Sequence, residues 1–194
     1  MKYRIIQKLG ATIVVSAALV AFLSLSVMAL FTDTASVPAN LFTTGTVDIS
    51  TSPTTALVTF SGMAPGDQVT APVTVNNAGT LQLRYAVTST TTEDTLAGQL
   101  DLTIKSGVTT CTNAGFAADG TVVYATGDLG STAGVNVIGN PAQGGQGGDR
   151  TLNASASEVL CVNVSLPSST GNTYQGLSTT ATLAFQAEQT SNNP

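Results

Sequence analysis

The chain has 194 residues, of which only 9% are charged, and it contains no His. After residue 30 it carries three Lys and Arg residues against eleven Asp and Glu residues, a net charge of −8. Such a surface repels phosphate backbones and excludes nucleic-acid binding. The lack of His also removes the usual general base and the usual zinc ligand.

The first thirty residues have the pattern of an export signal. A basic leader, Met1–Gly10, precedes the uncharged and mostly apolar run Ala11–Leu30, which as a helix would span about 30 Å of hydrocarbon. Val27 and Ala29 place small residues where a signal peptidase requires them, which predicts cleavage between Ala29 and Leu30. The alternative is a retained membrane anchor. In both cases we expect the rest of the chain outside the cytoplasm, secreted or at the cell surface.

Beyond the signal, alternation of apolar and polar residues predicts β-strands. The five long alternating series lie at Val69–Val75, Leu81–Val87, Leu100–Ile104, Leu160–Leu166 and Ala181–Ala187. Shorter candidates lie at Phe42–Ile49, Ala56–Phe60, Thr121–Ala125 and Gly134–Ile138. Only Thr92–Leu100 could form a helix in this part of the chain, and it would be short. The pattern predicts an all-β fold, an antiparallel β-sandwich of Greek-key or jelly-roll type behind an N-terminal signal helix.

The organisation that follows has four parts: a signal peptide (1–29), an N-terminal segment (30–50), the sandwich domain (51–190) and a short C-terminal tail (191–194). Within the sandwich, Pro141–Thr151 is too rich in glycine for a fixed strand, and we expect a mobile surface loop there. It has no Lys and no following helix, so it does not fit a phosphate-binding loop.

The two cysteines, Cys111 and Cys161, both lie in the exported part. In an oxidising compartment a lone pair is most simply one disulfide. Two separate buried thiols are the alternative. A catalytic Cys is disfavoured because no His is present to generate the thiolate.

The carboxylates show no catalytic pattern. They are scattered along the chain, and a facing pair of the glycosidase type can be neither identified nor excluded from the sequence. Glu93, Asp94 and Asp101 could hold Ca²⁺ through oxygen ligands, or could lie in a solvated loop. We therefore predict no cofactor, and leave calcium binding at these three residues open.

The N-terminal segment combines a free chain end with bulky apolar residues. These residues are Leu30, Phe31, Leu41, Phe42, Val47 and Ile49. An exposed apolar end is a liability unless it is buried. It could fold back on its own sandwich, or it could add as a strand to the open sheet edge of a neighbouring copy.

Several segments of the sequence together resemble the TasA/camelysin family. They are Phe31–Thr34, Asn40–Ile49, Val58–Ser61, Met63–Val69, Val75–Leu81, Tyr174–Gly176 and Ala184–Glu188. The resemblance implies a jelly-roll sandwich and a signal cut by a dedicated peptidase. It also implies a structural subunit of extracellular biofilm-matrix fibres, which assemble when the N-terminal segment of one subunit completes the sheet of the next. The implied partners are further copies of this chain and related matrix subunits.

Two other functions compete with this expectation. The first is a monomeric surface adhesin or binding module, although the absence of Trp and the few Tyr disfavour sugar stacking platforms. The second is a secreted hydrolase, since some members of the family have been classed as metalloproteases. The chain has no His-Glu-x-x-His motif, and a zinc site made of carboxylates alone would be unusual, so we do not expect an enzyme.

Overall fold

The computed structural model describes residues 41–55, 57 and 61–193. The expected cleavage site at Ala29 and Leu30, together with Phe31, lies outside these residues. The fold described below is that of the unit Thr44–Pro194. Among the described residues, no helix is long and apolar enough to cross a membrane.

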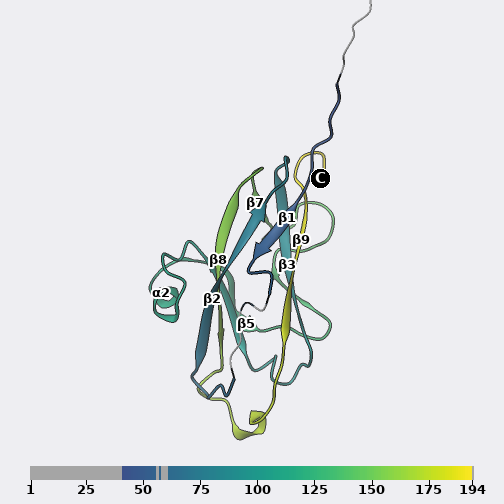
Figure 1. Cartoon of the computed structure of the whole chain (residues 1–194). Helices are drawn as coiled ribbons and strands as arrows, with labels where there is room; N and C mark the ends of the chain where they lie inside the picture. The colour runs from purple at the N-terminus through teal and green to yellow at the C-terminus, as the bar shows by residue number, and fades with distance from the viewer. Residues whose placement is uncertain (1–40, 56, 58–60, 194) are drawn as a thin grey trace, which may run out of the picture. The chain divides into compact units, whose positions relative to one another are not determined.

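The strands form two antiparallel sheets, as the alternation predicts (Figure 1). The first sheet holds, in spatial order, β1 (Ile49–Ser52), β2 (Gln68–Asn77), β8 (Ser157–Ser165), β4 (Asp101–Ser106) and β5 (Thr121–Asp128). The second sheet is built around β3 (Leu83–Thr91), which pairs along its length with β9 (Ala181–Gln189) and, over its two halves, with β6 (Val135–Ile138) and β7 (Arg150–Leu152). The predicted all-β sandwich is confirmed.

The core lies between the two sheets and is made by the alternating residues of the long strands. Its fully buried members include Val75 from β2, Leu83 and Tyr85 from β3, Leu102 and Ile104 from β4, and Leu160 from β8. Burial of one such aliphatic side chain stabilises the fold by about 1.5–3 kcal/mol. The period of two seen in the sequence is therefore the direct cause of the layered fold.

Local predictions differ from the structure in four places, one of which is the short helix at Asn113–Ala118, where no helix was expected. Thr92–Leu100 is not a helix but a series of turns, because the Glu93 carboxylate accepts the amides of Thr95, Leu96 and Ala97 and fixes a loop instead. The strand expected at Phe42–Ile49 begins only at Ile49. The strand β7 begins at Arg150, inside the range expected to be a loop, where the Asp149 side chain accepts the amides of Asn140 and Gln146 and closes the loop before it. Of the candidate at Ala56–Phe60, only Leu57 is described.

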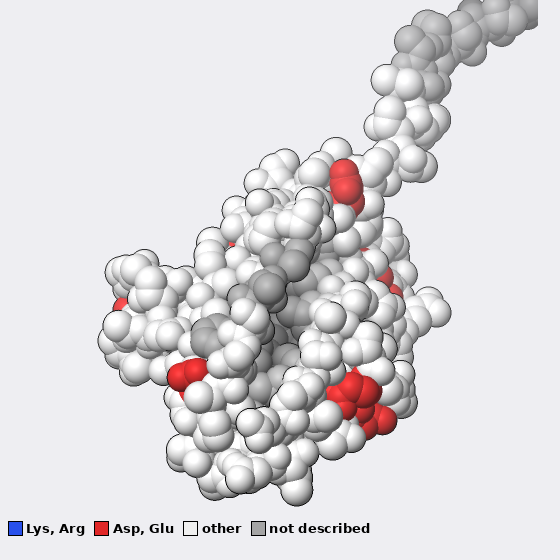
Figure 2. Space-filling model, turned by 60° about the horizontal axis from the view of Figure 1, so that its bottom comes forward, with Lys and Arg blue, Asp and Glu red and all other residues white. Residues whose placement is uncertain are grey.

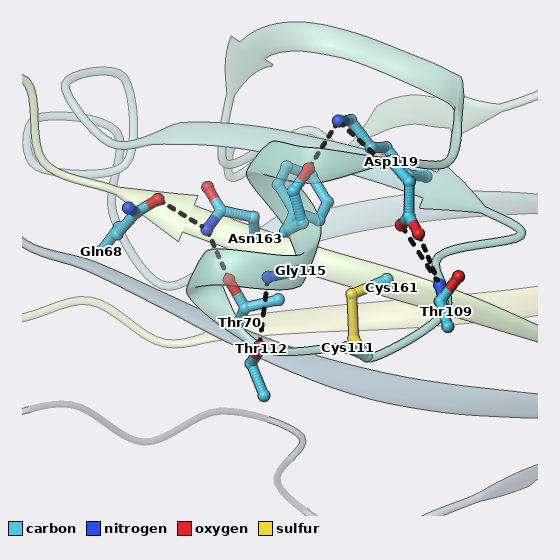
Figure 3. The surroundings of a disulfide bond; sticks show 11 residues. Gln68, Thr70, Thr109, Cys111, Thr112, Gly115, Asp119, Cys161 and Asn163 are labelled. Atoms are coloured by element: carbon cyan, nitrogen blue, oxygen red, sulfur yellow. Dashed lines mark hydrogen bonds between the residues drawn. A yellow bond between two sulfur atoms is a disulfide. The ribbon is translucent and has the colours of Figure 1, made fainter.

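The predicted disulfide between Cys111 and Cys161 is present, with 5.6 Å between the two Cα atoms (Figure 3). It joins β8 to an excursion between β4 and β5 that contains the short helix α2 (Asn113–Ala118). Thr112 caps the start of this helix, and the Lys105 ammonium donates to the carbonyl of Phe116 at its end, at 2.6 Å. Cys161 alternates with the core residues Leu160 and Val162, and it is still only 1% exposed.

Candidate functional site

Two strand edges carry the candidate site. The strand β1 ends the first sheet and pairs with β2, whereas β9 pairs with β3 in the second sheet. Within the described residues, neither β1 nor β9 has a strand on its other edge. The two strands approach each other, so the free edges border the same opening of the sandwich. Free edges present unpaired backbone groups to any incoming strand.

Between these edges lies an apolar cleft of about 600 Å³. One wall comes from β9 through Leu183 and Phe185, and the opposite wall comes from Val69 of β2 and Val164 of β8. The floor is formed by core residues, among them Leu100, Leu102, Leu129 and Val162. These core residues are themselves buried, with Leu102 at 0% and Val162 at 2% exposure, so the cleft reaches the core without opening it to solvent.

The rim of the cleft is polar but uncharged. Thr51 of β1 and residues 179–182 at the start of β9 contribute hydroxyl and small side chains. No Asp, Glu, Lys or Arg occurs among the described residues that line the cleft. Such a lining favours an apolar, uncharged occupant.

The basic side chains in the described part of the chain are all engaged internally. Arg84 binds Glu188, Arg150 binds Glu158, and Lys105 binds the helix carbonyl of Phe116 and lies 4.6 Å from the centroid of its ring. Figure 2 agrees with this, since every charged residue visible on that face is acidic. No basic side chain among the described residues is therefore left without an internal partner.

The apolar residues of the N-terminal segment, which are predicted to add as a strand to a neighbouring copy, differ in how far the structure places them. Ile49 lies in β1, where it is opposite Asn77 of its own chain. Val47 is in coil and 38% exposed, while Leu41 and Phe42 are 84% and 91% exposed. Leu30 and Phe31 lie outside the described residues, so strand donation by this segment stays a prediction.

The three carboxylates considered for calcium do not gather into a site. Glu93 caps the turn described above, and the hydrogen bond from the Leu96 amide is the main reason that the pKa of its carboxyl is lowered. Asp94 accepts from the amide and the hydroxyl of Thr132, whereas Asp101 stands opposite Asp128 on β5. In the described part of the chain, no three His, Cys, Asp or Glu side chains are grouped so that they could hold a metal ion.

A second polar cluster connects the two sheets. The Tyr85 hydroxyl on β3 donates to Glu158 on β8 at 2.6 Å, and the Arg150 guanidinium on β7 binds both oxygens of the same carboxylate. Burial, followed by the bond to Glu158, raises the pKa of Tyr85. With every polar group paired and Tyr85 only 1% exposed, this cluster joins the sheets rather than presenting groups to a substrate.

A comparison with known families identifies the family to which the chain belongs. A family model described as camelysin metallo-endopeptidase matches residues 4–193, almost the whole chain. The chain belongs to the TasA/camelysin family. This confirms the resemblance seen in the sequence. No curated protein matches the chain.

The family description implies a catalytic metal, and the residues of this camelysin-family chain do not fit one. The chain has no His, and both of its cysteines are consumed by the disulfide. Among the described residues, no three of the remaining carboxylates come together as a metal site would require. Zinc peptidases use His with a carboxylate or Cys around an open coordination position, and this donor set is missing here.

Sequence reasoning identified some parts of this site and missed others. The alternation of apolar and polar residues over Ala181–Ala187 predicts that Leu183 and Phe185 lie on the same face of a strand. The cleft itself was missed, because its walls come from strands that are far apart in the sequence and no local pattern reports which edges stay unpaired.

Proposed function

We propose that this protein is a secreted structural subunit of extracellular, biofilm-matrix fibres that assembles head to tail. Residues Leu30–Phe42 of the N-terminal segment, freed by a signal peptidase, enter the cleft of the next copy and pair with an edge strand there, while Ile49 stays paired with Asn77 of its own chain. The apolar cleft carries the proposal, together with the edges of β1 and β9, which have no second neighbour among the described residues. Membership of the TasA/camelysin family supports it.

The chemistry of the two partners is complementary. The segment Leu30–Phe42 has Leu and Phe at both of its ends and a single charged residue, Asp33. At about 3.3 Å per residue, its thirteen residues extend over about 43 Å, which is longer than an ordinary strand. A backbone ladder would supply affinity, and the alternate side chains entering the cleft would supply register.

This geometry also explains why the product would be a filament. The donating segment and the receiving cleft are different surfaces of the same chain, so the contact is heterologous. A heterologous contact that does not close into a ring propagates without limit. A retained signal would keep the donor in the membrane, so cleavage would time assembly. Related matrix subunits with the same segment could enter the same cleft.

The first test removes the donor. Chain beginning at Leu30 should form filaments that sediment and are visible by electron microscopy, and chain lacking Leu30–Ala35 should stay monomeric. If the two proteins behave alike, the proposal is wrong.

The second test blocks the acceptor. Leu183→Lys places an ammonium in the apolar wall, and the flexible Lys stem lets the charge reach the opening, so the domain should fold. Ala184→Lys, one residue along β9 on the opposite face, is the matched control because Ala184 is exposed and does not line the cleft. Filaments from the Ala184→Lys chain and none from the Leu183→Lys chain would support the cleft as acceptor.

A mixture of the two assembly-deficient proteins gives a sharper result. The Leu183→Lys chain keeps its donor and the truncated chain keeps its cleft, so together they should form a one-to-one dimer that cannot grow. Analytical ultracentrifugation would detect it. Failure to form this dimer, with both chains folded, would contradict the proposed pairing of segment and cleft.

A binding module is the second candidate, and the size of the cleft is the observation that favours it. A volume of about 600 Å³ lies within the range of small-molecule pockets. In this case chain beginning at Leu30 would remain monomeric and would bind an apolar fluorescent probe, with binding lost in Leu183→Lys. We propose no enzymatic role, because the chain has no His and no three His, Cys, Asp or Glu side chains group together in its described part.

A further inference from the structure

The last part of the N-terminal segment, just before β1, is bound to the sandwich domain of its own chain. Strand pairing between β1 and β2 ends at Ile49 and Asn77. The chain before Ile49 then runs along the turn that follows β2. We call the two contacting stretches, Gly45–Asp48 and Asn77–Leu81, the clasp.

Hydrogen bonds close the clasp from both sides. The Thr46 amide donates to the Thr80 hydroxyl at 2.9 Å, and the amides of Thr80 and Leu81 donate to the Thr46 carbonyl at 3.0 and 3.1 Å. The Ala78 amide donates to the Asp48 carbonyl at 2.8 Å. These bonds hold the main chain of residues 46–48 in place although every residue of that stretch is exposed.

Close packing of two glycines adds to the bonds. A Cβ atom on Gly79 would overlap the Thr46 carbonyl oxygen and would lie 2.9 Å from the Asp48 amide nitrogen, both of them backbone atoms. A Cβ on Gly45 would lie 2.5 Å from the Leu81 side chain. The clasp therefore closes only when position 79 has no side chain, a requirement of close approach and not of backbone conformation.

Hydrogen bonds of a buried side chain also hold the turn Asn77–Leu81, against which Thr46 packs. The Asn77 side chain is 1% exposed, and its oxygen accepts the amide of Gly79 at 3.0 Å. Its nitrogen donates to the carbonyls of Leu81 and Asn153 at 2.8 and 3.0 Å. A buried amide with these partners holds the turn in one shape, so the surface that Thr46 meets is formed in advance.

From these contacts we infer that the clasp is a fixed anchor for the N-terminal extension. It fixes Thr44 as the point at which the chain leaves its domain. The residues before Thr44 can then pair with a neighbouring copy, while β1 remains paired with β2 of its own chain. The consequence for fibres rests on the proposed function: with a fixed exit point the link between subunits is short, and the axial repeat is uniform. The anchor itself does not depend on fibre formation.

The anchor can be tested by amide hydrogen exchange measured residue by residue. The measurement uses chain beginning at Leu30 and carrying Leu183→Lys, which is expected to be monomeric whether or not the native chain forms fibres. The amides of Thr46, Ala78, Thr80 and Leu81 should be protected, and the amide of Thr44 should not. Adding Gly79→Ala should speed exchange at these four amides about tenfold or more, while the amides of β3 and β8 stay protected.

Matched variants separate the clasp from general destabilisation. Gly171→Ala is the control, because a Cβ at that exposed glycine meets nothing within 4 Å. If Gly79→Ala does not fold, Thr80→Val removes only the hydroxyl that accepts from Thr46, and Thr80→Ser should restore protection of the Thr46 amide. Unprotected clasp amides in the parent chain, or unchanged protection in Gly79→Ala, would overturn the inference.

The fibre consequence has its own readout. In chain beginning at Leu30 with an intact cleft, Gly79→Ala should abolish filaments or broaden their axial repeat in electron micrographs, and Gly171→Ala should not. If the clasp amides lose protection and the axial repeat is unchanged, the clasp does not set the spacing of subunits. That result would overturn the proposed consequence for fibres. If no chain forms filaments, the proposed function fails, and the four amides still decide whether the anchor exists.

Discussion

Two regions of the sandwich differ in chemistry: the polar cluster that links the two sheets, and the apolar cleft between β1 and β9. At the junction of β3, β7 and β8, the buried hydroxyl of Tyr85 and the guanidinium of Arg150 share one carboxylate, Glu158, across the two sheets. Along β1 and β9, apolar side chains line a cleft between strand edges that have no second neighbour among the described residues. The joined side is polar and paired, and the open side is apolar and unpaired.

This difference separates stability from assembly. Removal of one member of a buried, paired cluster leaves charges and hydroxyls without partners, which is costly to the folded state. The cleft is lined by apolar side chains and uncharged Thr hydroxyls, with no ion pair to break, so changes there affect mainly what can enter it. Variants on the joined side should therefore unfold more easily and still assemble, whereas Leu183→Lys should do the opposite.

The largest effect on stability should follow removal of the disulfide. Replacing Cys111 and Cys161 by Ala releases a loop with a sequence separation of 50, and the chain-entropy relation gives a loss of about 4 kcal/mol as an upper figure. The excursion with α2 should lose its order first, because the disulfide attaches it to β8. Urea unfolding of the chain lacking Leu30–Ala35, with and without the two substitutions, measures the loss.

The double Cys variant also tests the separation directly. In chain beginning at Leu30, and well below its unfolding temperature, it should form filaments like those of the parent. A folded variant that no longer assembles would show that the excursion takes part in the contact between subunits, and the contrast between the two sides would have to be redrawn.

The next largest effect should come from Glu158→Ala, with a loss of about 3 kcal/mol in the free energy of unfolding. The substitution strands the Tyr85 hydroxyl and frees Arg150, whose side chain is only 29% exposed. Glu158→Gln keeps an acceptor for Tyr85 and should cost less. Asp128→Ala removes the same charge from an exposed position and serves as the control. Equal effects of Glu158→Ala and Asp128→Ala would show that the cluster contributes nothing specific.

The same cluster should give the protein an alkaline limit. Burial raises the pKa of Tyr85 in the folded state above its ordinary value near 10. Folding then favours the protonated hydroxyl, so this contribution is complete below pH 10. Above it, only the unfolded state loses the proton, and stability falls by about 1.4 kcal/mol per pH unit. Urea midpoints measured between pH 8 and pH 11 should show this slope, and Tyr85→Phe should reduce it. An identical slope in the variant would place its origin in other groups.

The sequence predicts the joined parts of the molecule better than the open ones. Alternation at Leu160 and Val162 places both on one face of β8 without any knowledge of the partner strand. The disulfide followed from two cysteines in an exported chain. The helix α2 was missed because its six residues are too few for a helical period, and it is held by the distant ammonium of Lys105.

The open side could not be predicted because its features depend on long-range pairing. No residue of β9 indicates that the described strands leave one of its edges without a neighbour, since that depends on where the other strands go. Gly79 has no unusual backbone dihedral that would mark it, and its role comes from Thr46, which contacts the same turn from 34 residues away. A glycine required by such an approach resembles any other glycine in the sequence.

The smallest predicted effect concerns the opposite edge of the first sheet. On β4 and β5, Asp101 and Asp128 stand directly opposite each other, and like charges in that position repel. Asp128→Asn should therefore stabilise the domain by about 0.2–0.5 kcal/mol at neutral pH, with the gain shrinking as added salt screens the pair. Exposed charges also discourage edge-to-edge pairing. If Asp128→Asn makes the truncated chain associate, charge is what keeps β5 from pairing with another copy, in contrast to the uncharged lining of the cleft. If the variant is less stable than its parent, the two carboxylates are not in repulsion, and the β5 edge differs from β1 for another reason.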